Sequence, residues 1–173
     1  MRHHLPAYSQ FLDVKNKSWQ RRSCGIVALK MVLEYWKTPN TTIPSLSHLI
    51  QEGHECGAYI KNIGWKHKGL VDLGKKYGLR GKNYDWAKKK PHEALQKLIH
   101  LVTQYPIIAS VYRTLIPGTH GNLVVITKIT KTHVWYHDPD SHTRKGVRKK
   151  TTIKKFTQGW KQRIVLLYSK RKG

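Results

Sequence analysis

The order in which the hydrophobic periodicity changes along the chain is the feature that most limits its fold. Helical spacing comes first, because apolar residues from Cys24 to Trp36 and from Pro91 to Gln104 recur three and four positions apart. The apolar runs that follow are short, β-branched and aromatic, which is typical of strands. Helices followed by strands indicate an α+β fold with an antiparallel sheet, since a parallel sheet needs strands and helices in alternation.

The remaining elements are assigned from turn and cap signals. Shorter helices are expected from Pro44 to about Gln51, from Lys68 to Tyr77 and over residues 153–158, with irregular segments at 5–23 and 53–65. The predicted strands are Ile107–Tyr112, Leu123–Ile129, His133–His137 and Ile164–Tyr168. The 173 residues suit a single domain, with a helical part at about 24–104, a sheet part at about 105–168 and a basic tail at 169–173.

The charge of the chain bears on its partners rather than on its fold. Thirty-three Lys and Arg against nine Asp and Glu leave a formal net charge of +24. Many of the basic side chains follow one another in the last third of the sequence, at Arg144, Lys145, Arg148, Lys149, Lys150, Lys154 and Lys155. We expect this run to attract a polyanion such as RNA, the ribosome or an anionic surface. The alternative is a dispersed coat of solvated lysines that serves solubility.

Several kinds of protein are disfavoured by what the sequence lacks. No window approaches the ~20 apolar residues of a membrane span, and Met1–Pro6 is not followed by the apolar segment of a signal peptide. A cytoplasmic location is therefore expected. Cys24 and Cys56 are too few for a disulfide framework, so two free thiols are expected. His48, His54 and Cys56 lack a fourth ligand at a usual spacing, and we expect neither a metal ion nor another cofactor.

Cys24 is the first candidate for chemistry. It lies in the first turn of the best-defined helix, where free N–H groups and the helix dipole stabilise a thiolate, which is the nucleophilic form. Gly25 leaves room for a substrate backbone, while Arg21 and Arg22 add positive potential. The simpler alternative is that Cys24 is a small buried apolar residue, as most lone cysteines are.

A nucleophilic cysteine needs a base, and the base is usually distant in sequence. His120 precedes the predicted strand Leu123–Ile129, and Asp138 follows the next strand. The start of one antiparallel strand lies beside the end of its neighbour, so His120 and Asp138 are predicted to be close, with Asp138 orienting the imidazole. Taken alone, Asp138-Pro139 is also an ordinary turn initiator.

These residues lie in segments that resemble one known family. The helix from Ser23 to Trp36, with Cys-Gly followed by small and apolar residues and then Met-Val-Leu, resembles the active-site helix of the double-glycine-leader peptidases, which are papain-like cysteine peptidases. Leu123–Ile126 and His137-Asp138-Pro139 are similar to that family's histidine strand and Asp-Pro segment. Residues 64–79 resemble the helical part of its stand-alone members. The resemblance covers about residues 7–168.

The resemblance implies a papain-like fold in which the cysteine helix packs on a C-terminal antiparallel sheet. It also implies a Cys-His-Asp triad and a glutamine that completes the oxyanion hole. The nucleophile then falls on Cys24 and the orienting acid on Asp138. The family's glutamine position, six residues before the cysteine, is held here by Ser18. Gln20 is the nearest candidate for the oxyanion hole and Gln10 a more distant one.

The expected histidine is where this chain departs from the family. The family reads Gly-His-Leu-Val-Val, whereas this chain has Asn122 before Leu123 and carries His120 two positions earlier. An asparagine is no base. Two interpretations stay open: His120 serves as the base of a peptidase that hydrolyses a peptide or protein substrate, or the chain is a degenerate peptidase that acts as a basic binding module.

Overall fold

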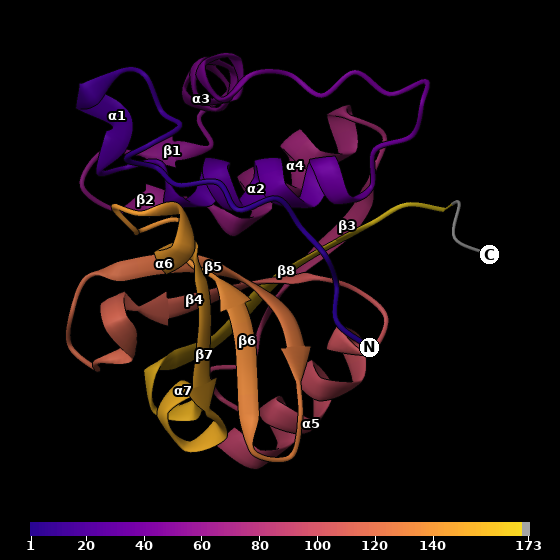
Figure 1. The fold of residues 1–173 in the computed structure, drawn as a ribbon, viewed down its shortest axis with the longest axis vertical. Helices are drawn as coiled ribbons and strands as arrows, with labels where there is room; N and C mark the ends of the chain where they lie inside the picture. The colour runs from indigo at the N-terminus through magenta and orange to yellow at the C-terminus, as the bar shows by residue number, and fades with distance from the viewer. Residues whose placement is uncertain (171–173) are drawn as a thin grey trace.

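A computed structural model describes residues 1–170 and consists of a sheet with helices on both of its faces (Figure 1). The helices are α1 (Lys17–Gln20), α2 (Cys24–Tyr35), α3 (Leu46–Glu55), α4 (His67–Lys76), α5 (Pro91–Val102), the 3-10 turn η1 (Arg113–Leu115), α6 (Arg144–Val147) and α7 (Ile153–Gly159). The strands are β1 (Tyr59–Ile60), β2 (Gly64–Trp65), β3 (Arg80–Asp85), β4 (Ile107–Tyr112), β5 (Gly121–Ile129), β6 (His133–His137), β7 (Arg148–Thr152) and β8 (Trp160–Tyr168).

The main sheet has six strands in the order β3-β8-β4-β5-β6-β7, and every neighbouring pair is antiparallel. Its two faces build two cores. Leu123 and Val125 of β5 belong to a first core with α2, α3 and α4, while Val124 and Ile126 belong to a second core with α5 and α7. Alternate residues of a strand face opposite sides, so β5 is buried on both faces. The predicted α+β class and the antiparallel sheet are confirmed.

Helix α2 is buried along nearly its whole length and packs against β5. Figure 1 shows the two elements next to each other. All residues from Gly25 to Leu33 are buried, and a helix that is apolar on all sides belongs inside a core. Even Lys30 is enclosed, and its ammonium group donates to the Pro44 carbonyl at 2.8 Å and pairs with Glu34 at 2.8 Å. This burial fixes the first turn of α2, and with it Cys24, against the sheet.

An aromatic cluster supports the start of α2. The Trp65 indole packs on Gly25 and donates its N–H to the Arg22 carbonyl at 2.6 Å. The Trp19 and Tyr59 rings contact Trp65 at tilted angles and each other edge to face. The Arg22 guanidinium lies 4.2 Å from the Trp19 ring centroid. The residue before α2, Ser23, makes no capping bond, because its hydroxyl donates to the Trp19 carbonyl at 2.6 Å.

Several element boundaries differ from the sequence-based prediction. Helix α3 begins at Leu46 rather than Pro44, because the Ser45 hydroxyl accepts the His48 N–H and caps it there. Strands β3 and β7 were not predicted, since both are edge strands that carry mostly polar side chains. Strand β3 therefore joins the sheet from within the part expected to be helical. Residues 171–173 of the predicted basic tail lie outside the described residues.

None of the helices among residues 1–170 has the length and apolar character that crossing a bilayer requires.

We predict that Gly25→Ala destabilises the protein by about 1–3 kcal/mol, the usual cost of overpacking a filled core. A Cβ at this position would lie 2.7 Å from Trp65 Cγ, and the Trp65 side chain is held in place by its bond to Arg22. The free energy of unfolding in urea measures the effect. Gly121→Ala is the matched control, because its added Cβ meets only the mobile end of Lys161, at 3.1 Å. Equal stability of the two variants would contradict the tight fit at Gly25.

Candidate active site

A pocket of about 500 Å³ opens at the N-terminal end of α2, next to the start of β5. Two loops close it, one around residues 9–13 and the other after β6. Its walls are formed by Gln10, Phe11, Arg21, Cys24, Arg113, His120, Gly121, Asn122, Asp140 and His142. The structure thus brings Cys24 and His120 to one cavity, together with Gln10, the more distant of the two glutamine candidates, and with Asn122 and His142.

Cys24 is half-buried at the first position of α2. Removal of its sulfur from water raises the pKa of the thiol to about 11, although the N–H groups of Leu123 and Gly25 hydrogen-bond the sulfur and favour the thiolate. The negative charges of Asp138 and Asp140 add to the rise. Cys24 is therefore a neutral thiol in the free protein at neutral pH, and its sulfur lies beside the first residues of β5.

Asp138 is buried directly after β6, and its partners differ from those expected. The Asn122 side-chain amide donates to Asp138 Oδ1 at 2.9 Å, and Lys149 Nζ pairs with Asp138 Oδ2 at 2.7 Å. The Asp140 N–H also donates to Oδ1, at 2.9 Å. The side chain that contacts Asp138 is therefore Asn122, the residue directly before Leu123 of β5. The predicted contact of Asp138 with His120 is not formed.

His120 lies immediately before β5, on the rim of the pocket. Its carbonyl accepts the Arg113 N–H at 2.8 Å, which fixes its backbone, while its side chain is exposed. Among residues 1–170, no side chain makes a hydrogen bond to its imidazole. The ring is thus positioned over the pocket with no carboxylate to orient it.

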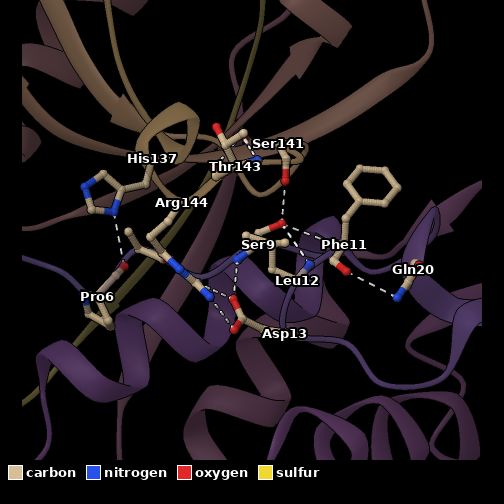
Figure 2. A network of polar contacts seen from close by, with 11 residues as sticks. Pro6, Ser9, Phe11, Leu12, Asp13, Gln20, His137, Ser141, Thr143 and Arg144 are labelled. Atoms are coloured by element: carbon tan, nitrogen blue, oxygen red, sulfur yellow. Dashed lines mark hydrogen bonds and ion pairs between the residues drawn. The ribbon is translucent and has the colours of Figure 1, made fainter.

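A polar network holds the loop that carries Gln10 against the residues after Asp138, and Figure 2 shows its members Ser9, Asp13, Ser141 and Arg144. The Gln10 N–H donates to the Pro139 carbonyl at 2.9 Å, and the neighbouring Ser9 hydroxyl donates to the Ser141 carbonyl at 2.5 Å. Asp13 closes the loop by pairing with Arg144 at 2.5 Å. Burial opposes ionisation of Asp13, but hydrogen bonds from Arg144 and from the Ser9 N–H lower its pKa below the usual value. These contacts hold the loop in the position in which Gln10 lines the pocket.

The two candidate glutamines have different roles in the structure. Gln20 Nε2 donates to the carbonyls of Val14 at 2.9 Å and Phe11 at 3.3 Å, so it braces the loop and does not line the pocket (Figure 2). Gln10 is only 4% exposed, lines the pocket with Cys24, and its Oε1 has no hydrogen-bond partner among the described residues. Of the two candidate glutamines, Gln10 and not Gln20 therefore lies at the pocket that contains Cys24. Spacing to the cysteine misled the prediction, because the intervening loop includes helix α1.

Other side chains around the pocket carry positive charge. Arg113 pairs with Asp140 at 2.6 Å, whereas Arg21 makes no ion pair within the described part of the chain. His142 stacks on Phe11 with ring centroids 3.9 Å apart. Sequence reasoning missed His142, because a histidine in an irregular loop after Asp-Pro gives no periodic signal. Within residues 1–170, no group of three or more His, Cys, Asp or Glu is arranged to hold a metal ion.

We compared the sequence with models of known protein families. Residues 5–164 match the model of the peptidase C39-like family. The chain belongs to that family. The match spans both halves of the pocket, from the loop that carries Gln10 to the residues after β6. The search of curated proteins found no match.

Solved structures give the fold of this C39-like chain. It is similar to the double glycine motif protease of an AMS/PCAT transporter, solved with the leader peptide, at 19% identity over 96% of this chain and 92% of that one, with a TM-score of 0.62. A C39-like peptidase from Bacillus anthracis matches at 17% identity over 98% and 96%, with a TM-score of 0.67. The peptidase domain of Streptococcus ComA matches at 16% identity over 87% and 93%, with a TM-score of 0.62. The fold is that of the C39 papain-like peptidases.

We predict that alkylation of Cys24 by iodoacetamide accelerates with pH up to about 11, because the buried thiol ionises only there. The rate is measured by intact mass in a Cys56→Ala variant. The exposed Cys56, measured in a Cys24→Ala variant, serves as the reference thiol and should react faster at neutral pH. A rate for Cys24 that instead levels off in the range of a histidine pKa would show a thiolate paired with imidazolium in the free protein.

Proposed function

We propose that this protein is a cysteine peptidase in which Cys24 and His120 act as a pair, without an orienting carboxylate. The observation that carries the proposal is that Cys24, His120 and Gln10 line one pocket at the N-terminus of a buried helix. These three groups supply a nucleophile, a base and an oxyanion donor, which are the parts that acyl transfer from a peptide requires.

The neutral state of the thiol determines how the first step proceeds. When a peptide fills the pocket, the Cys24 sulfur attacks the scissile carbonyl carbon while an imidazole nitrogen of His120 takes the thiol proton. The tetrahedral oxyanion then collapses, the C–N bond breaks and the imidazolium returns its proton to the leaving amine. Water attacks the resulting thioester, with His120 again as the base, and releases the new carboxyl end and the free thiol.

Gln10 and the start of α2 stabilise the charge that develops on the carbonyl oxygen. The Gln10 side-chain amide and the free N–H groups of the first turn of α2 are the available donors at this end of the pocket. The Gln10 loop is held by the Ser9–Ser141 and Asp13–Arg144 contacts, so these donors need little reorganisation during the reaction. The substrate is a peptide, in keeping with the leader peptide bound to the transporter protease of the same fold.

The contact between Asn122 and Asp138 favours a second candidate function. An asparagine fills the family's histidine position and satisfies the buried carboxylate, so the site keeps its shape without its usual base. If His120 does not reach the sulfur, the pocket binds a peptide without cleaving it. This candidate is a peptide-binding domain derived from a peptidase.

Hydrolysis of an internally quenched peptide library by the intact chain tests the first candidate. We predict that His120→Ala lowers kcat by about 100-fold, the typical contribution of a general base, because no other group then accepts the thiol proton. Asn122→His is expected to raise kcat by a similar factor, because it places an imidazole between Cys24 and Asp138.

Two further histidine variants make the test specific. His92→Ala, on the exposed start of α5, is the matched control and should leave kcat unchanged. If His142→Ala abolishes hydrolysis and His120→Ala does not, the base is assigned to the wrong histidine. Binding of peptides without hydrolysis, unaffected by Cys24→Ala, would replace the peptidase by the second candidate.

A further inference from the structure

A second surface with a distinct chemical character lies on β5, β6 and β7, away from the pocket. Lys128 on β5 is the register partner of Trp135 on β6, and Trp135 is in turn the partner of Lys150 on β7. The two ammonium groups lie 5.0 and 5.1 Å from the Trp135 ring centroid. We call Lys128, Trp135, Arg148 and Lys150 the basic face. None of them lines the Cys24 pocket.

The side chains of the basic face point away from the second core. Val134 and Tyr136, which alternate with Trp135 along β6, are buried in the second core with α5 and α7. Trp135 is half-buried, while Lys150 and Arg148, two residues apart on β7, are both exposed. Figure 1 shows β5, β6 and β7 side by side, with α6 and α7 at opposite ends of β7. Neighbouring strands are about 4.8 Å apart, so the row from Lys128 to Lys150 spans roughly 10 Å.

The positive charge of the basic face is not neutralised within the protein. Lys128, Arg148 and Lys150 form no ion pair with any described residue. From residue 94 to residue 173 the sequence contains only two carboxylates, Asp138 and Asp140. Both form ion pairs, Asp138 with Lys149 and Asp140 with Arg113. Arg144 and Lys149, which the sequence placed in the same basic run, are thus committed to internal ion pairs and do not contribute to the basic face.

We propose that the basic face binds single-stranded nucleic acid, with Trp135 stacking on a base and Lys128, Arg148 and Lys150 contacting phosphates. An aromatic side chain among unpaired cations suits this ligand, because each base offers a π-face and each phosphate a charge. An anionic membrane fits less well: the exposed large aliphatic residues described, Met1, Leu12, Ile63 and Ile116, all lie outside β5–β7. This binding is independent of the peptidase proposal.

Fluorescence anisotropy of a short labelled uridylate oligomer and of its thymidylate equivalent tests the proposal on the full chain. We expect both to bind, with log K falling steeply against log salt, by about 0.7 per phosphate neutralised. The double variant Lys128→Ala/Lys150→Ala should reduce that slope by about 1.4. Trp135→Ala should weaken binding about tenfold, within the range for the loss of one stacked base, whereas Trp135→Phe keeps a stacking ring and should weaken it much less.

Matched controls make each outcome decisive. Lys61→Ala/Lys88→Ala removes the same charge from exposed turns elsewhere and should alter affinity less than the Lys128/Lys150 pair. Cys24 alkylation should be unchanged in all variants that fold, because the basic face is separate from the pocket. The proposal is overturned if both lysine pairs act equally, if Trp135→Ala binds as well as Trp135→Phe, or if phosphatidylserine vesicles bind the chain and neither oligomer does.

Discussion

The hydrogen bond from Asn122 to Asp138 determines how the functional part of this structure is arranged. It joins the start of β5 to the loop after β6, and both groups are buried, so neither can be left without a partner at low cost. The same carboxylate holds Lys149 of β7 and the Asp140 N–H. The loop fixed in this way in turn accepts the Gln10 N–H and the Ser9 hydroxyl. One buried contact therefore connects the Gln10 loop, the sheet and the wall of the pocket.

The burial of α2 fixes the position of Cys24, the second part of the site. The helix is enclosed on all sides, so its first turn cannot shift relative to β5, and the Cys24 sulfur rests against the Leu123 N–H. The consequence is a thiol that is well placed but not ionised. Reactivity then depends on a base that reaches the sulfur when the pocket is filled. In the proposed mechanism that base is His120, which lines the same pocket as Cys24.

Much of this arrangement was accessible from the sequence, and the parts that were not have physical reasons. Helix α2, strands β4 and β6, and the positions of Cys24 and Asp138 follow from apolar periodicity and from the family's motifs. Strands β3 and β7 were missed, because edge strands with polar side chains carry no alternating pattern. Gln10 was ranked behind Gln20 because linear spacing ignores the path of the loop through α1. The predicted partner of Asp138 was His120, whereas the structure has Asn122 there, since the two residues are near neighbours in sequence and only three-dimensional geometry separates them.

The central claim is that His120 replaces the missing family histidine and allows Cys24 to form an acyl-enzyme. Trapping that intermediate tests it most directly, by rapid acid quench of the protein with an activated peptide ester followed by mass spectrometry of the intact chain and its fragments. The account predicts one acyl group on Cys24 in the native protein and a much slower build-up in His120→Ala. Absence of any adduct on Cys24 while the peptide saturates the pocket would contradict it.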